Sequence, residues 1–132
     1  MLIPCEVAVK IVLPCIRALM ANELMSRYHL KQAEAAKKLE ISQAAISMYQ
    51  KKLRGNSINL ENDAEIKSLV TKYVGSLMNN SLNPKQKVGS VCEICKIIRF
   101  KGYLCHIHKN LDPKIDVKNC NFCKSSYLLV CP

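Results

Sequence analysis

The chain has 132 residues, of which 49% are hydrophobic and 5% aromatic, and it contains no tryptophan. This length suits one ordinary domain, or a small domain beside a module that a large core does not stabilise, and so few rings argue against a deep ligand pocket. Twenty Lys and Arg against ten Asp and Glu give a formal charge of +10, so we expect a polyanionic partner: nucleic acid or an anionic membrane surface.

The first residues, MLIPCEVAVKIVLPCIRALMA, are apolar but do not fit a signal peptide. They lack a basic leading region, and Glu6, Lys10 and two prolines interrupt them. No stretch reaches the roughly 18 uncharged apolar residues that a membrane helix needs. We therefore expect a cytoplasmic protein with no membrane partner, in which the eight cysteines supply metal ligands rather than a disulfide framework.

Helical patterns begin near the N-terminus. Residues 3–12 fit either a short helix or an extended arm. Pro14 can start a helix because its missing amide hydrogen is not needed there, and apolar residues at helical spacing then predict a helix over residues 14–28.

Residues 32–53 predict two short helices joined by a tight turn. Residues 32–39 and 43–53 are rich in helix formers, and Glu40 to Ser42 interrupt them, with Ser42 as the N-cap of the second helix. A helix-turn-helix needs a small residue at the helix crossing and apolar residues facing the core. Ala36, Ile41 and Ile46 supply these.

A further helix follows, capped by Asn62 or Asp63. Its apolar residues recur at steps of three and four, so the stripe either completes the core or forms a dimer seam. The stripe consists of Ile66, Leu69, Val70, Tyr73, Val74 and Leu77. Residues 80–91 are rich in Asn, Ser, Pro and Gly and predict a linker between a domain at 1–79 and a cysteine-rich module at 92–132.

Over residues 16–76 the sequence resembles the Cro and lambda-repressor class of helix-turn-helix regulators. In that class a glutamine opening the first helix of the motif contacts a phosphate and braces a second glutamine, which opens the recognition helix and reads an adenine. Gln32 and Gln43 are eleven positions apart, which is the separation of the two glutamines in that class. Glu40 departs from the class, which has a left-handed glycine there; a side chain at such a position costs about 1 kcal/mol.

The resemblance implies the DNA-binding residues. Gln43 would read a base as a bidentate partner of adenine, while the cations at the helix end would hold phosphates. The full set is Gln32, Ser42, Gln43, Ala44, Ser47, Met48, Lys51, Lys52 and Arg54. Within the class, IPCEVAVKIVLPCIRALMANEL, QAAIS and LRG look like archaeal transcription regulators with a cysteine-rich tail, a likeness that covers nearly the whole chain.

The module contains a series of metal-ligand spacings. The candidate ligands are Cys92, Cys95, Cys105, Cys120 and Cys123, with His108 as a further candidate. Each CxxC pair is expected to place its thiolates on one tight turn. A zinc ion would take either the two CxxC pairs, or Cys92 and Cys95 together with Cys105 and His108.

An iron-sulfur cluster is the rival of zinc because five thiols are present, and reduced thiols without metal are the third alternative. A polar segment of this size cannot bury enough surface to fold alone, so a metal would supply the missing stability. Cys5 and Cys15, in apolar surroundings, are expected to be small core residues, and Cys131 to be free.

We therefore predict a mainly α protein: a lambda-repressor-like helical DNA-binding domain followed by a small irregular metal-binding module. The expected function is transcription regulation by a homodimer on double-stranded DNA, with the module serving structure, dimerisation, or redox or metal sensing. The alternative is a nucleic-acid or protein adaptor whose zinc module does the binding. We expect no enzyme and no small-molecule substrate, because no glutamate accompanies an open ligand site.

Overall fold

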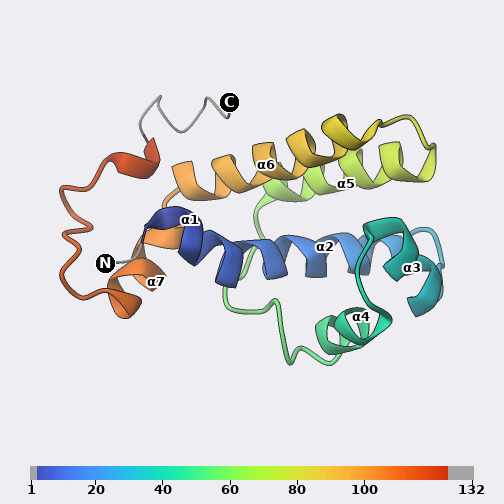
Figure 1. Cartoon of the computed structure of the whole chain (residues 1–132), viewed down its shortest axis with the longest axis horizontal. Coiled ribbons are helices and arrows are strands. Elements are labelled where there is room, and N and C mark those ends of the chain that lie inside the picture. Colours follow the sequence, from blue (N-terminus) through green and yellow to red (C-terminus); the bar gives the residue numbers. More distant parts are fainter. Residues whose placement is uncertain (1–2, 125–132) are drawn as a thin grey trace.

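Residues 4–26 form one continuous helix. The computed structural model describes residues 3–124, and in it α1 (Pro4–Val7) runs into a π-helical segment (Ala8–Val12) and then into α2 (Leu13–Ser26) (Figure 1). A proline within a helix removes a hydrogen bond and crowds the carbonyl four residues earlier; the wider π turns before Pro14 relieve that crowding. The helix predicted to begin at Pro14 therefore begins earlier, and residues 4–12 are helical rather than an extended arm.

The predicted pair of short helices is confirmed. α3 (Gln32–Leu39) and α4 (Gln43–Gln50) pack on each other and on α2, although α4 ends at Gln50 rather than near residue 53. Ser42 caps α4 as expected, because its Oγ accepts a hydrogen bond from the backbone N–H of Ala45 at 3.1 Å.

The apolar stripe of α5 (Ala64–Met78) lies inside the chain. Asp63 caps this helix by accepting hydrogen bonds from the N–H groups of Glu65 and Ile66 at 3.1 and 3.2 Å. The helix packs against α2, and five members of the stripe are buried there: Ile66, Val70, Tyr73, Val74 and Leu77. The stripe was predicted either to complete the core or to form a dimer seam. The structure confirms that it completes the core, so the stripe is not available for a contact between two chains.

The linker predicted at residues 80–91 is wrong from residue 84 onward, where α6 (Pro84–Phe100) begins. The side chain of Asn83 accepts from the N–H of Gln86, and that of Gln86 accepts from the N–H of Asn83, both at 2.9 Å. This reciprocal capping, with Pro84 at the first helical position, starts a helix. Asn83, Pro84 and Gln86, which are among the residues that suggested a linker, thus cap and start α6.

The cysteine-rich segment shares the core of the rest of the chain. α6 packs on α5 and α2, and Ile94, Ile98 and Leu104 are buried in the same cluster as the residues of those helices. After α7 (Tyr103–Leu111), a short 3-10 helix (Phe122–Lys124) follows. An irregular module is thus wrong for residues 92–111, which are helical, because their apolar side chains reach the common core.

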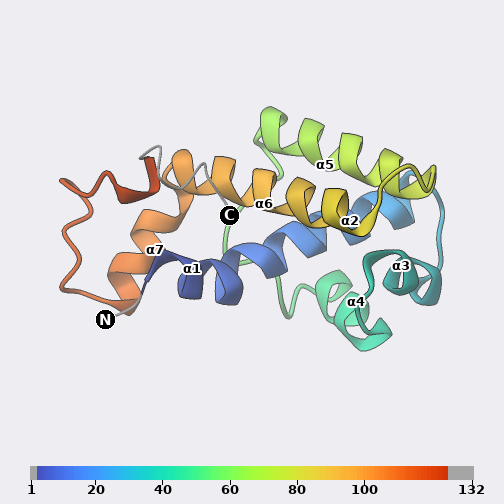
Figure 2. The same cartoon turned by 45° about the horizontal axis from the view of Figure 1, so that its top comes forward.

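Over residues 3–124 the protein is mainly helical, as predicted, and contains no strand. None of the helices in this range combines the length and the apolar character needed to cross a membrane. Both views place the α3–α4 pair at one end of helix 4–26, whereas α1, α7 and the 3-10 helix lie at the other (Figures 1 and 2). At about 1.5 Å per residue, the helix between these ends is about 35 Å long.

Candidate nucleic-acid interface and cysteine cluster

The turn between α3 and α4 is left-handed at Glu40. Its φ and ψ are 56° and 41°, and the N–H of Ile41 donates to the carbonyl of Ala36 at 3.0 Å, which closes the end of α3. Ala36 and Ile46 are buried and Ile41 is half-buried against the core, as predicted. A glutamate therefore occupies the conformation that usually falls to glycine, and the helix-turn-helix arrangement is retained around it.

One face of α4 is accessible. Gln43, Ala44 and Met48 are exposed and Ser47 is half-buried. Their spacing places them on one side of a helix, opposite Ile46, which is fully buried. The structure thus brings together the residues that the sequence assigned to the groove face.

Gln32 has a different partner from the one that the resemblance implies. Its Nε2 donates to Oε1 of Gln50 at 2.6 Å, which joins the start of α3 to the end of α4. The amide of Gln43 is therefore not held by Gln32 in this arrangement.

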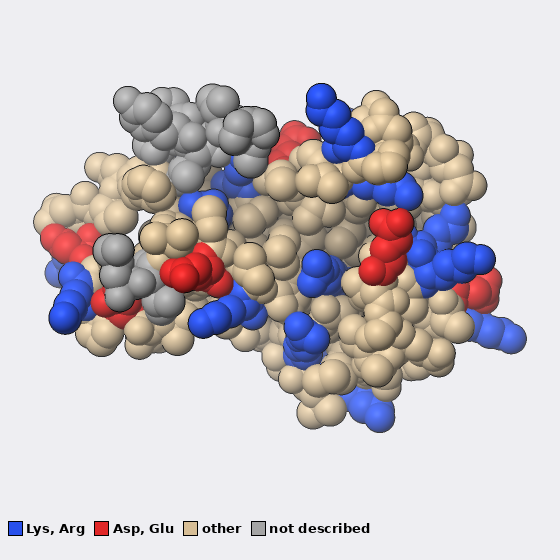
Figure 3. Space-filling view, in the orientation of Figure 1, with Lys and Arg blue, Asp and Glu red and all other residues tan. Residues whose placement is uncertain are grey.

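Cations surround the exposed end of the helix pair. Lys51, Lys52 and Arg54 are all exposed after α4. Figure 3 shows Lys and Arg side chains around the end of the molecule that holds α3 and α4, with acidic side chains between them. The charge that would attract a polyanion is present at this end.

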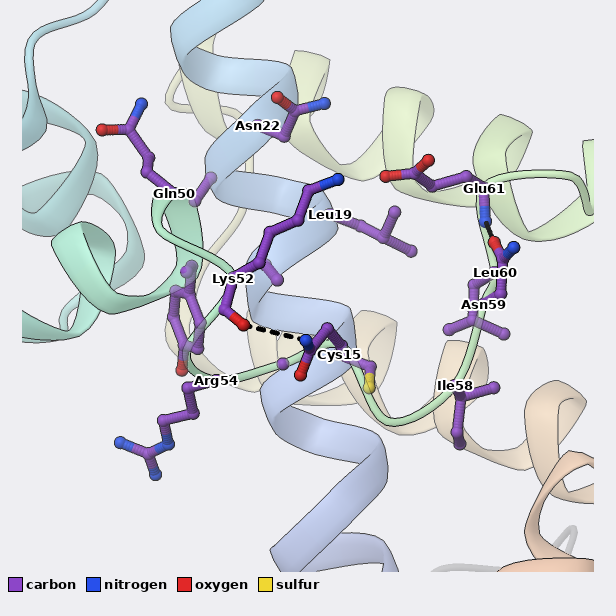
Figure 4. Close-up of a pocket in the computed structure, with 15 residues that line it drawn as sticks. Cys15, Leu19, Asn22, Gln50, Lys52, Arg54, Ile58, Asn59, Leu60 and Glu61 are labelled. Atoms are coloured by element: carbon purple, nitrogen blue, oxygen red, sulfur yellow. Dashed lines mark hydrogen bonds between the residues drawn. The ribbon is translucent and has the colours of Figure 1, made fainter.

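A groove of about 400 Å³ separates α2 from the loop that follows α4. Lys52 extends across it toward α2, whereas Arg54 points away (Figure 4). The side-chain amide of Asn56 donates to the carbonyl of Lys52 at 2.8 Å and supports the left-handed backbone there, whose φ is 55°. The two cations are thus presented in different directions from one short loop.

At the opposite end, cysteines from several segments converge. Cys5 lies on α1, Cys92 and Cys95 on α6, Cys105 on α7 and Cys123 on the 3-10 helix, and these helices contact one another there. The first CxxC pair lies on a regular helix rather than a tight turn. Residues three apart on a helix still share a face, so the two thiols remain neighbours.

A small cavity of about 20 Å³ lies among four of the candidate ligands. Cys105, His108, Cys120 and Cys123 line it, a combination that matches neither predicted zinc scheme. Burial raises the pKa of the Cys95 and Cys105 thiols, which favours their protonated forms. As the side chains stand, no three His, Cys, Asp or Glu within residues 3–124 are grouped closely enough to hold a metal ion.

Arg99 lies among these thiols, and no local pattern in the sequence points to it. It is 7% exposed, and its Nη1 donates to Sγ of Cys5 at 3.7 Å. Its Nε and Nη2 are buried and have no hydrogen-bond partner within residues 3–124. Burial opposes the charge of Arg99, but its hydrogen bond to Cys123 and the nearby thiols outweigh burial and raise its pKa.

The two cysteines near the N-terminus differ in their surroundings. Cys5 is exposed, so the expectation that it is a core residue is wrong: the first helical turn buries Val7 and leaves Cys5 at the surface beside Arg99. Cys15 is 2% exposed and confirms that expectation. Cys131 lies outside the described residues.

Comparisons with protein-family models, curated proteins and solved structures found no match to this chain.

Proposed function

We propose that this chain is a sequence-specific DNA-binding transcription regulator in which α3 and α4 form the helix-turn-helix. The observation that carries the proposal is the helix pair itself. Buried Ala36 and Ile46 hold the two helices together across a left-handed turn, while the face that begins at Gln43 stays exposed. Such a pair docks its second helix in the major groove of double-stranded DNA.

Two kinds of contact follow from the side chains at this end. Gln43 donates to and accepts from the edge of an adenine through its amide, and Ala44, Ser47 and Met48 line the same groove. Lys51, Lys52 and Arg54 bind phosphates, which fixes the register without reading the sequence. The formal charge of +10 favours this association at low salt.

The regulator acts as a homodimer. One recognition helix reads too few base pairs for specificity, and two-fold proteins read half-sites about one helical turn apart. The contact must come from a surface other than the apolar stripe of α5, because that stripe is buried within one chain.

The cysteine end holds a zinc ion or an iron-sulfur cluster, with ligands drawn from Cys92, Cys95, Cys105, Cys120, Cys123 and His108. Thiolates suit these soft centres, and four of the candidates line one small cavity. Since α6 and α7 already reach the core, the metal serves to hold residues 112–124 rather than to fold the whole segment.

Metal analysis and an anaerobic absorbance spectrum of the purified chain test this part. An iron-sulfur cluster absorbs in the visible range and zinc does not. Protein that retains neither iron nor zinc, and takes up neither when they are supplied, would remove the metal from the proposal.

Selection of bound duplexes from a random DNA library tests the DNA-binding part, and we expect an enriched palindrome. On that operator Gln43→Ala should lose about 1–3 kcal/mol of binding free energy and change the preference at one base pair. Lys52→Ala should weaken operator and random DNA alike.

Equal losses on operator and random DNA for Gln43→Ala would remove the assignment of the recognition helix. Phe122→Ala is the matched variant at the cysteine end of the molecule, because Phe122 is 52% exposed beside Cys123. If Phe122→Ala abolished nucleic-acid binding and Gln43→Ala did not, the adaptor function would replace the one proposed.

A further inference from the structure

Within the described residues, Arg99 is a buried charge without a carboxylate partner. Within residues 3–124 no Asp or Glu carboxylate forms an ion pair with it, and its neighbours are thiols. A buried cation is costly unless an anion or a full set of hydrogen bonds compensates it, yet two of its nitrogens have no partner. The site therefore has the chemistry to accept an anionic group.

Four cysteines lie on the helices that meet near this guanidinium. Cys92, Cys95 and Arg99 are spaced three and four residues apart on α6 and share one face of that helix. Cys5 approaches from α1 and accepts a hydrogen bond from Nη1 of Arg99 at 3.7 Å, and the 3-10 helix that carries Cys123 packs against α6. Three segments far apart in the sequence thus bring sulfur to one cationic side chain.

We propose that Cys5, Cys92, Cys95 and Cys123 form one tetrathiolate site for a soft metal centre, and that Arg99 is the positioning residue that balances its charge. Four thiolates around Zn²⁺ leave two negative charges in excess, and an iron-sulfur cluster held by four cysteines is likewise anionic. Sulfur atoms of either centre would supply the acceptors that Nε and Nη2 lack.

As the side chains of residues 3–124 stand, these thiols are not grouped closely enough to hold a metal, so binding requires their sulfurs to move together. Each thiol would release its proton to solvent as the metal–sulfur bond forms. The inference rests on the metal part of the proposed function and adds a ligand outside the cysteine-rich segment. Through Cys5 the metal would join the start of helix 4–26 to α6 and the 3-10 helix.

Cobalt titration of the metal-free full-length chain tests the ligand set, because the sulfur-to-cobalt absorption grows with the number of thiolates bound. The wild type should show four thiolates, and Cys5→Ser should show three and bind Co²⁺ at least about tenfold more weakly. Serine at the exposed position 5 opens no cavity and still accepts a hydrogen bond from Arg99, so a merely structural contact is preserved.

Two control variants accompany it. Cys15→Ala, on the same continuous helix but buried elsewhere, should bind Co²⁺ as the wild type does. Cys105→Ser should also keep four thiolates. If Cys105→Ser lost a thiolate and Cys5→Ser did not, the cavity of Cys105, His108, Cys120 and Cys123 would be the site and the inference would be overturned.

The same variants are reconstituted anaerobically with ferric iron, sulfide and excess dithiothreitol, which reduces part of the iron to the mixed-valence state of such clusters, to separate the two kinds of centre. A visible band in the wild type that Cys5→Ser loses supports the inference for a cluster. If the wild type takes up neither Co²⁺ nor iron, the metal part of the proposed function fails as well. Equal uptake by the wild type and Cys5→Ser overturns this inference alone.

Arg99→Met separates charge compensation from packing. It should weaken Co²⁺ binding about 10–100-fold, the usual effect of losing a group that supports a metal ligand. The metal-free variant should melt no lower than the wild type, because methionine removes two unpartnered donors. Arg99→Lys should recover part of the affinity, whereas wild-type affinity in Arg99→Met would refute the role of the charge.

Discussion

Glu40 carries a local cost in the turn of the helix-turn-helix. Its φ of 56° lies in the left-handed region, where a β-carbon is crowded by the following carbonyl, and its side chain is exposed. Glu40→Gly should therefore raise the free energy of unfolding by about 1 kcal/mol, less the extra entropy that glycine gains in the unfolded chain. Urea unfolding of the wild type and of Glu40→Gly measures this difference in the free energy of unfolding.

Glu40→Ala is the matched control, because it removes the carboxylate but keeps the β-carbon. It should show no comparable gain in the free energy of unfolding. If alanine stabilised the chain as much as glycine, charge rather than backbone strain would explain the effect.

Residue-level features that depend on near neighbours could be predicted from the sequence. The sequence predicts Ser42 as one cap and Asn62 or Asp63 as the other, because a cap bonds to groups two or three residues away; the structure selects Asp63. The Arg99–Cys5 contact joins residues 94 positions apart, so no local spacing reveals it. Because residues 84–91 were interpreted as a linker, the sequence did not predict that Cys95 and Arg99 lie on one helix.

At the scale of elements, the loop after α4 depends on its close approach to α2. Gly55 has φ +76°, and a β-carbon there would lie 2.6 Å from the carbonyl oxygen of Pro14 and 2.9 Å from Cβ of Ala18. Gly55→Ala should lower the free energy of unfolding by at least about 1–2 kcal/mol from the backbone conformation alone. Chemical denaturation checks the value, and the displaced loop should also weaken DNA binding through Lys52 and Arg54.

Gly89 provides the comparison for that substitution. It lies within α6, and a β-carbon there would meet no atom within 4 Å. Gly89→Ala should stabilise the chain by about 0.5–1 kcal/mol, since alanine is the better helix former. Equal effects of the two substitutions would contradict the close approach at Gly55.

The start of α5 is tied to the α6–α7 junction by Asp63. Its carboxylate accepts from the hydroxyl of Tyr103 at 2.7 Å and from Nζ of Lys101 at 3.0 Å. These hydrogen bonds, that of Tyr103 foremost, lower the pKa of Asp63 from 3.8 to about 2. Because the folded-state pKa is depressed, its stabilising contribution is complete above the unfolded value and is lost as the pH falls toward about 2.

Asp63→Asn tests this pH dependence, since asparagine keeps the N-cap but has no charge. The melting temperature of the wild type should fall between pH about 4 and about 2, and the variant should fall less over that range. Circular dichroism of metal-free protein at constant ionic strength follows both. Identical slopes for the wild type and Asp63→Asn would contradict the assigned pKa.

Elements with clear periodicity were predicted, and those that depend on distant partners were not. Helices α3, α4 and α5 follow from helix formers, caps and an apolar stripe in the sequence itself. The helix before Pro14 needs π turns, and its buried Val7 and Val12 face a core that includes Ile98. Residues 103–111 are helical in a segment predicted as irregular, and Leu104 packs into the common core.

At the scale of the whole molecule, the cysteine-rich segment cannot be separated cleanly from the helix-turn-helix. A fragment of residues 1–79 would lack Ile94, Ile98 and Leu104, and would expose the apolar surfaces of α2 and α5 that these residues cover. Loss of DNA binding by that fragment would report a damaged core as readily as a missing metal. The coupling of the two ends must therefore be measured on the full chain.

One element links the two ends directly. Helix 4–26 carries Cys5 near its start, and its α2 part packs against both α3 and α4. A metal held through Cys5 would restrain the segment before Pro14, where the π turns interrupt the regular hydrogen bonding. Removing the metal should therefore lower operator affinity about fivefold or more, the lower end of usual coupling between sites.

Fluorescence anisotropy on the selected operator, at one fixed salt concentration, compares the metal-loaded and chelator-treated full chain. Cys5→Ser should bind the operator like the treated wild type even when metal occupies its three remaining thiolates, because the link from the metal to helix 4–26 is lost. Cys15→Ala should respond to metal as the wild type does, because Cys15 is not one of the four proposed ligands. If affinity and stoichiometry were the same with and without metal, the cysteine end would not control DNA binding. Its exposed Phe100 and Phe122 would then be the surface to examine for a protein partner.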